Sequence, residues 1–195
     1  MLPVPYDPNT SIKLLSLDPG SESLGCAVYE FDCLTFELTA IHAWTQRGSR
    51  LPQNQWIAHL YGDRVARIAA HEDELLRTMQ HHNPVAVVCE SPFINIKRPA
   101  AYGALTEVVS AVRSATIRTQ AWIPLYFVEP STAKRAVGAK GNSDKDGVRV
   151  ALRNNALIMS RLMMSIDMLD EHAVDAVAIG YHHYTQCREG RFPLY

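Results

Sequence analysis

Residues 14–32 read LLSLDPGSESLGCAVYEFD, and this stretch decides the fold. An apolar run ends in Asp18, the pair Pro19-Gly20 turns the chain, and a second apolar run begins at Gly25. The pattern predicts two neighbouring strands joined by a tight turn. Such a turn does not need an acid at the end of a buried strand. We therefore interpret Asp18 as a candidate for chemistry and look for further acids that would lie beside it.

Apolar periodicity and turn residues predict the other elements. Strands are expected at Ile12–Leu17, Gly25–Phe31, Leu34–Trp44, Val85–Glu90 and Leu125–Val128, with a loop at Arg47–Asn54. Helices are expected at about Gln55–His82, Pro99–Gln120, Thr132–Val137, Asp144–Asn154 and Glu171–Tyr184, whereas the Met-rich stretch Leu157–Met168 is ambiguous. Three strands in hairpin-like succession, followed by alternating helices and strands, predict an α/β fold with a mixed sheet flanked by helices.

Length and composition suit one globular domain. The chain has 195 residues, 47% of them hydrophobic, so we expect a single domain at residues 12–195 after a flexible leader at residues 1–11. No apolar stretch approaches the roughly 20 residues of a membrane helix, and the N-terminus lacks the basic region of a secretory signal. The four cysteines form no CxxC pair, which favours a reducing, cytoplasmic setting and argues against a zinc site.

The net charge of −1 hides an uneven distribution. Residues 97–153 carry ten Lys or Arg against four acids, a balance of +6, whereas the rest of the chain has nine basic and sixteen acidic residues, a balance of −7. A basic segment in an acidic chain is typical of a polyanion-binding face. Ordinary solvated helix faces would give the same count, so charge alone leaves both interpretations open.

A second strand also ends in an acid. The run VAVVCE at residues 85–90 is apolar up to Glu90, and Ser91-Pro92 follow at once. If this strand lies parallel to the first strand, with the long helix between them in the chain, then Asp18 and Glu90 lie side by side at one edge of the sheet. Two such carboxylates repel and raise each other's pKa, and a divalent cation bound between them removes that cost.

The last predicted helix supplies two further groups. His172 and Asp175 are three residues apart and therefore share one face of the helix. Each acid has an ordinary structural explanation by itself, as a turn residue, a solvated strand end or a partner of the helix dipole. Taken together, Asp18, Glu90, His172 and Asp175 predict one metal-binding site.

Four segments of the chain, in order, are similar to the motifs of a known family. They are LSLDPGSESLGCAVYE (15–30), AVVCESPFINIKRPAAYGAL (86–105), VEPSTAKRAVGAKGNSDKDGVRVAL (128–152) and HAVDAVAIGYHH (172–183). They resemble the RuvC family of Holliday-junction resolvases, which have the RNase H-like fold. Two departures stand out. Many family members have Asp where this chain has His172, and the segment between the first two motifs is long, with Trp44–Trp56 as the expected extra loop.

The resemblance implies paired hydrolysis of DNA phosphodiesters at four-way junctions by a homodimer with two Mg²⁺ or Mn²⁺ ions in each site. Asp18 would bridge the ions, Glu90 and Asp175 would hold one each, and His172 would either ligate a metal or orient and deprotonate the water. Lys145 would offset charge at the phosphate. The DNA-binding residues implied are Phe93, which would stack on unpaired bases, and the basic residues Lys97, Arg98, Lys134, Arg135, Lys140 and Lys145.

Three alternatives remain open from the sequence. The same site and fold would serve a nuclease for flaps, forks or RNA-containing duplexes. The DPGS turn also resembles the phosphate-binding loop of actin-like ATPases and sugar kinases, although those proteins need two such domains and a later Gly-rich motif. A junction-binding protein without catalysis is the last alternative, but it would have no reason to gather acids at one edge of a sheet.

Overall fold

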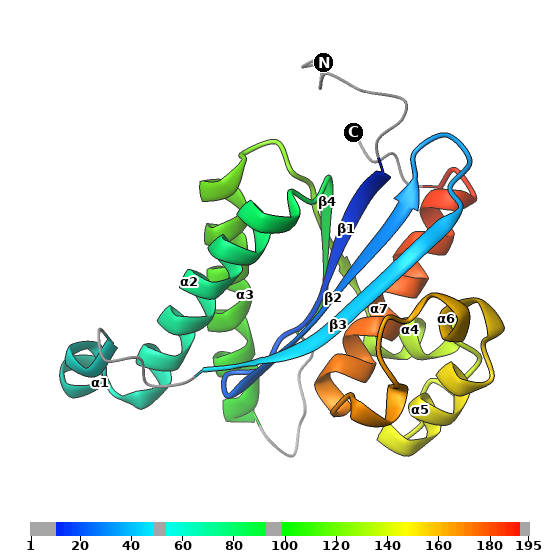
Figure 1. Cartoon of the computed structure of the whole chain (residues 1–195). Helices are drawn as coiled ribbons and strands as arrows, with labels where there is room; N and C mark the ends of the chain where they lie inside the picture. The colour runs from blue at the N-terminus through cyan, green and yellow to red at the C-terminus, as the bar shows by residue number, and fades with distance from the viewer. Residues whose placement is uncertain (1–10, 49–53, 93–98, 192–195) are drawn as a thin grey trace.

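The described residues form one mixed sheet with the strand order β3-β2-β1-β4-β5 (Figure 1). The computed structural model describes residues 11–48, 54–92 and 99–191. The strands are β1 (Ser11–Asp18), β2 (Ser23–Asp32), β3 (Leu38–Arg47), β4 (Ala86–Glu90) and β5 (Leu125–Val128). β2 is antiparallel to both β1 and β3, whereas β4 is parallel to both β1 and β5. The predicted fold class, three antiparallel strands followed by two parallel ones, is confirmed.

Helices cover both faces of this sheet. They are α1 (Gln55–Tyr61), α2 (Asp63–His82), α3 (Pro99–Thr119), α4 (Pro130–Ala136), α5 (Lys145–Arg153), α6 (Ala156–Arg161) and α7 (Glu171–Arg188). Figure 1 shows α2 and α3 on one face, and α7 with α4, α5 and α6 on the other. No helix in the described part of the chain is long and apolar enough to cross a membrane.

Alternation along β1 divides the core into two layers. Leu14 belongs to the apolar cluster that contains α7, whereas Leu15 and Leu17 belong to the cluster under α2 and α3. All three side chains are fully buried. Burial of each contributes about 1.5–3 kcal/mol relative to exposure, so both faces of β1 hold the strand in register.

Small residues let α7 approach the sheet closely. A Cβ atom added to Gly180 would lie 2.3 Å from the Tyr29 ring and 2.6 Å from Ser16 Oγ. The hydroxyls of Ser16 and Tyr29 donate hydrogen bonds to the α7 carbonyls of Ala176 and Val177, at 2.9 and 2.6 Å. These bonds satisfy buried polar groups and fix α7 along β1 and β2.

The predicted start of the third strand, at Leu34, is wrong. β3 begins at Leu38, and residues 33–35 form a turn. The Asp32 carboxylate accepts hydrogen bonds from the backbone amides of Leu34 and Thr35, at 2.9 and 2.8 Å, and Phe36 has a positive φ of 55°. An aspartate that bonds to the amides following it favours a turn over a strand, and this local bonding overrode the alternating pattern.

The predicted long helix is interrupted, and the predicted extra loop is shorter than expected. Gly62 separates α1 from α2 with φ 90° and ψ 161°, a conformation outside the helical region. β3 continues to Arg47, and α1 already begins at Gln55 within the expected loop. The ambiguous stretch Leu157–Met168 contains most of α6 and a 3-10 turn at Ile166–Met168. Of the predicted leader, only Ser11 lies in the described residues, where it begins β1.

Candidate active site

Asp18 and Glu90 occupy the ends of two adjacent parallel strands. The pairing of Leu17 with Cys89 places the next residue of each strand, Asp18 and Glu90, at the same edge of the sheet. Asp18 is 9% exposed although it ends the strand, and Glu90 is partly buried. The predicted parallel pairing is therefore correct, and it brings the two acids together.

α7 places His172 and Asp175 over the same edge. Gly25 of β2, which pairs with Asp18, makes this approach possible because a Cβ there would lie 2.1 Å from the His172 carbonyl oxygen. The carboxylate of Asp170 caps the helix by accepting a hydrogen bond from the Ala173 amide at 3.1 Å. The glycine at position 25, inside β2, was the sequence signal for this contact, and the predicted site did not include it.

The three carboxyl groups interact electrostatically. Burial, followed by repulsion from Asp18 and Asp175, raises the pKa of Glu90 to about 8. Burial and then repulsion from Asp18 raise the pKa of Asp175 to about 6. Lys134 opposes both shifts. The acids therefore form one cluster in which full ionisation is unfavourable without additional positive charge.

His172 provides part of that positive charge. Its Nδ1 atom lies 2.8 Å from Asp18 Oδ2, where the imidazole donates because a carboxylate accepts. This hydrogen bond is the main cause that raises the pKa of His172 above its ordinary value, against the effect of burial. The Nε2 atom lies 3.7 Å from a Glu171 oxygen. The protonated imidazole is thus stabilised beside the carboxylates.

The donor set fits a hard divalent cation in chemistry and in charge. Carboxylate oxygens are the ligands that Mg²⁺ prefers, and a bound cation would favour the ionised forms that burial now opposes. In residues 11–48, 54–92 and 99–191, no three His, Cys, Asp or Glu side chains converge closely enough to hold a metal ion as they stand. The Asp18–His172 hydrogen bond occupies one of the oxygen atoms that a metal would use.

Two of the predicted basic residues lie near the cluster. Lys134 donates a hydrogen bond to the Ser143 carbonyl at 2.8 Å, and Lys145 forms an ion pair with Glu171. Both lysines lower the pKa of Asp175, so both act on the site electrostatically. Arg135 donates to Thr132 Oγ1 at 3.1 Å, and Lys140 is exposed. The predicted residues Phe93, Lys97 and Arg98 lie outside the described residues.

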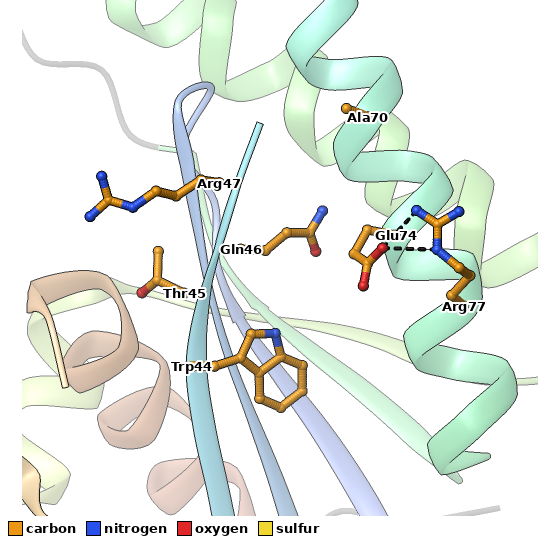
Figure 2. Close-up of a pocket in the computed structure, with 7 residues that line it drawn as sticks. All are labelled: Trp44, Thr45, Gln46, Arg47, Ala70, Glu74 and Arg77. Atoms are coloured by element: carbon orange, nitrogen blue, oxygen red, sulfur yellow. Dashed lines mark hydrogen bonds and ion pairs between the residues drawn. The ribbon is translucent and has the colours of Figure 1, made fainter. Parts of the chain in front are cut away.

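Two pockets lie on opposite sides of β3. A pocket of about 330 Å³ lies between β3 and α2, and its wall includes Gln46, Glu74 and Arg77 (Figure 2). A pocket of about 540 Å³ lies on the other side of β3, and its wall includes His172 and Lys145. Arg47 lines both. His172 lines the second pocket and bonds to Asp18, so this pocket is the one that adjoins the carboxylate cluster.

The comparisons with known proteins agree with this geometry. No family model matches the chain. A RuvC crossover junction endodeoxyribonuclease of Chlamydia trachomatis is 26% identical over 179 residues, which cover 87% of this chain and 89% of the relative. This chain is similar to RuvC along most of its length. The family resemblance that the four motifs predicted is thereby confirmed.

Solved structures show the same RuvC fold. RuvC of Thermus thermophilus matches with a TM-score of 0.67 at 22% identity, covering 92% of this chain and 98% of that one. The same protein in complex with a Holliday junction substrate matches with a TM-score of 0.68 at 20% identity, covering 92% and 97%. A yeast mitochondrial Holliday junction resolvase matches with a TM-score of 0.57 at 11% identity, covering 96% and 84%.

Proposed function

We propose that this chain is a metal-dependent endonuclease that resolves four-way DNA junctions by paired phosphodiester hydrolysis. The observation that carries the proposal is the cluster of Asp18, Glu90 and Asp175, joined by His172, at one edge of a RuvC-like sheet. The sequence relatives bear the name crossover junction endodeoxyribonuclease, and one of the matching structures is a complex with a Holliday junction. Buried acids that repel one another are a cost that a binding function alone would not require.

Asp18, Glu90 and Asp175 would hold the metal, with two Mg²⁺ or Mn²⁺ ions as the proposed complement. When bound, such ions supply an activated water and stabilise the leaving oxygen. Metal binding would favour the ionised form of Glu90, whose pKa of about 8 otherwise keeps it largely protonated at neutral pH. We propose His172 as the group that positions or exchanges a proton at the attacking water, because its Nδ1 is held by Asp18.

Basic residues would bind the DNA backbone. Lys134 and Lys145 lie close enough to the acids to affect their ionisation, and they would hold the backbone of the cleaved DNA strand at the cluster. Arg135 and Lys140 would contact more distant phosphates and give salt-dependent affinity with little sequence preference. We retain as expectations that Phe93 stacks on unpaired bases and that Lys97 and Arg98 grip the backbone.

A four-way junction has two-fold symmetry, and paired cuts therefore call for a symmetric pair of active sites. We propose that the chain acts as a homodimer. The helix that follows Phe93, α3, is the candidate contact face between the two copies.

The experiment that tests this function is cleavage of a synthetic four-way junction with Mg²⁺, with Mn²⁺ and with EDTA. We expect paired nicks that require metal and that fall at least about 10³-fold in Asp18→Asn, while junction binding persists. Asp32→Asn is the matched control, because Asp32 ends β2 at the opposite end of the sheet and bonds to its own turn.

Two outcomes would contradict the proposal. Junction binding without cleavage under either metal would make the chain a binding protein. Preferential cleavage of flaps, forks or RNA-containing duplexes would retain the site and change the substrate, so these substrates belong in the same panel.

A further inference from the structure

The pocket beside His172 brings together two cations that lie far apart in the sequence. It is the pocket of about 540 Å³ between the end of β3 and the helices α5 and α7. Arg47 enters from the last position of β3, and Lys145 enters from the first position of α5. His172, which bonds to Asp18, also lines the pocket, so these cations lie next to the carboxylate cluster.

Arg47 points toward this pocket and away from α2. Figure 2 shows its side chain on the opposite side of β3 from Gln46, whose side chain points toward α2. The Arg47 side chain is 78% exposed, and its guanidinium lies 3.9 Å from an Asp170 oxygen, beyond hydrogen-bond distance. An arginine with such a loose ion pair retains most of its donors for another anion.

Lys145 is held in a comparable way. Its side chain is 60% exposed, and it forms an ion pair with Glu171. Exposed ion pairs of this kind contribute only about 0–1 kcal/mol, so exchanging the carboxylate for another anion costs little. The third cation in the wall, Arg149, differs because it donates to the carbonyls of Ile166 and Leu169, and it therefore builds the wall.

We propose that this pocket binds a backbone phosphate of the DNA strand next to the cleaved bond, with Arg47 and Lys145 as its ligands. Asp170 and Glu171 hold these two cations in the absence of DNA and release them to the phosphate. The inference rests on the proposed function, and it adds Arg47 to the DNA-binding residues predicted from the sequence.

Loss of the Arg47 ion pair leaves α7 intact. Asp170 still accepts hydrogen bonds from the Ala173 amide and from Thr45 Oγ1, so its role as the helix cap does not depend on Arg47. A guanidinium also matches a phosphate with two parallel hydrogen bonds, which its long contact to Asp170 does not provide. The exchange therefore gains strong bonds without disturbing the element that carries His172 and Asp175.

The test is the salt dependence of junction binding, measured in EDTA by fluorescence anisotropy for the unmodified chain, Arg47→Ala and Arg77→Ala. The logarithm of the binding constant falls linearly with the logarithm of the salt concentration, and each lost phosphate contact reduces the steepness of that fall by about 0.9. We expect Arg47→Ala to lose about one such contact and about 3–10-fold in affinity. Arg77 is the matched control, since it lines the neighbouring pocket and bonds to Glu74 of its own helix (Figure 2).

Two further variants sharpen the test. Arg47→Lys should recover most of the salt slope, because it restores the charge. Glu171→Gln removes the carboxylate that holds Lys145 and should tighten junction binding several-fold. Thermal unfolding of each variant separates a loss of contact from a loss of fold.

The results distinguish this inference from the proposed function. If the unmodified chain binds and cleaves junctions but Arg47→Ala keeps the unmodified salt slope and affinity, the phosphate site is wrong and the function stands. If Arg77→Ala loses as much as Arg47→Ala, the effect is general surface charge and the site is again wrong. If the unmodified chain neither binds nor cleaves a junction, the function itself fails.

Discussion

Two histidines approach the loop after β1 from opposite faces of the sheet, and their environments differ. His71 reaches it from α2 and is fully buried, close enough to Ser21 for the backbone there to affect its pKa. His172 reaches it from α7 and is half-buried, and its Cε1 atom would lie 3.7 Å from a Cβ placed on Gly20. Both rings therefore support the loop that follows Asp18.

Their protonation is driven in opposite directions. His172 faces the Asp18 carboxylate, and this contact raises its pKa. His71 faces the Gln46 amide, with Gln46 Nε2 at 3.1 Å from its Nδ1, and burial lowers its pKa to about 4. Burial sets the direction at His71, whereas at His172 the hydrogen bond to a carboxylate outweighs burial. One ring is suited to proton chemistry, and the other to packing.

The largest expected effect is on the rate of junction cleavage, which should depend on His172 and not on His71. His172→Ala should reduce the rate of junction cleavage about 10²–10⁴-fold at saturating substrate, because it removes a proton-exchanging group next to Asp18. His71→Gln should stay within a few-fold of the unmodified chain, since an amide can replace the neutral ring. Single-turnover rates measure both. Equal losses in the two variants would mean that the rings share one role.

The effects on stability should have the reverse order, with a larger loss when His71 is replaced than when His172 is replaced. His71→Ala removes a fully buried ring and the partner of Gln46, and it should cost about 2–4 kcal/mol of unfolding free energy. His172→Ala should change it by less than about 1 kcal/mol, because this ring is half-buried at the edge of the sheet. Urea unfolding in EDTA at neutral pH compares them. A larger loss for His172→Ala would show that the Asp18 contact stabilises the fold.

The sequence predicted one of these rings as functional for identifiable reasons. Asp18 and Glu90 each end an apolar run just before a proline, and strand pairing alone then places them together. His172 precedes Asp175 by about one helical turn, so the two side chains share the face of α7 that lies over Asp18 and Glu90. His71 carries no such local signal, because its burial depends on how α2 packs on the strand that contains Gln46.

Arg47 was missed for a related reason. It lies at the predicted boundary between a strand and a loop, and one additional strand residue decides to which side of β3 its side chain points. Element boundaries follow from hydrogen bonds that local sequence does not specify, as the turn at Asp32 and the break at Gly62 also show. The carboxylates were predictable because neighbouring strands fix them, whereas residues at boundaries were not.

The smallest expected effect is a difference in how stability depends on pH. The folded pKa of His71, about 4, lies below the ordinary value of 6.5. Its contribution is therefore complete above pH 6.5 and is lost as the pH falls toward 4. The raised pKa of His172 has the opposite sign, so its contribution is complete below pH 6.5 and is lost as the pH rises through the folded value.

Unfolding of the unmodified chain, His71→Gln and His172→Gln at a series of pH values tests these signs. Between pH 6.5 and 4.5 the unmodified chain should lose about 2 kcal/mol more than His71→Gln, because in this range His71 takes up a proton in the unfolded chain but stays largely neutral in the folded one. Burial also lowers the pKa of His183 to about 4. Because His183 is present in every variant, its contribution cancels when the variants are compared. In NMR titrations Asp18→Asn should lower the midpoint of His172 and leave that of His71 in place. A shift of both midpoints in Asp18→Asn would mean that the loop after β1 couples the two rings. The difference between their pKa values would then arise from that loop and not from their separate partners.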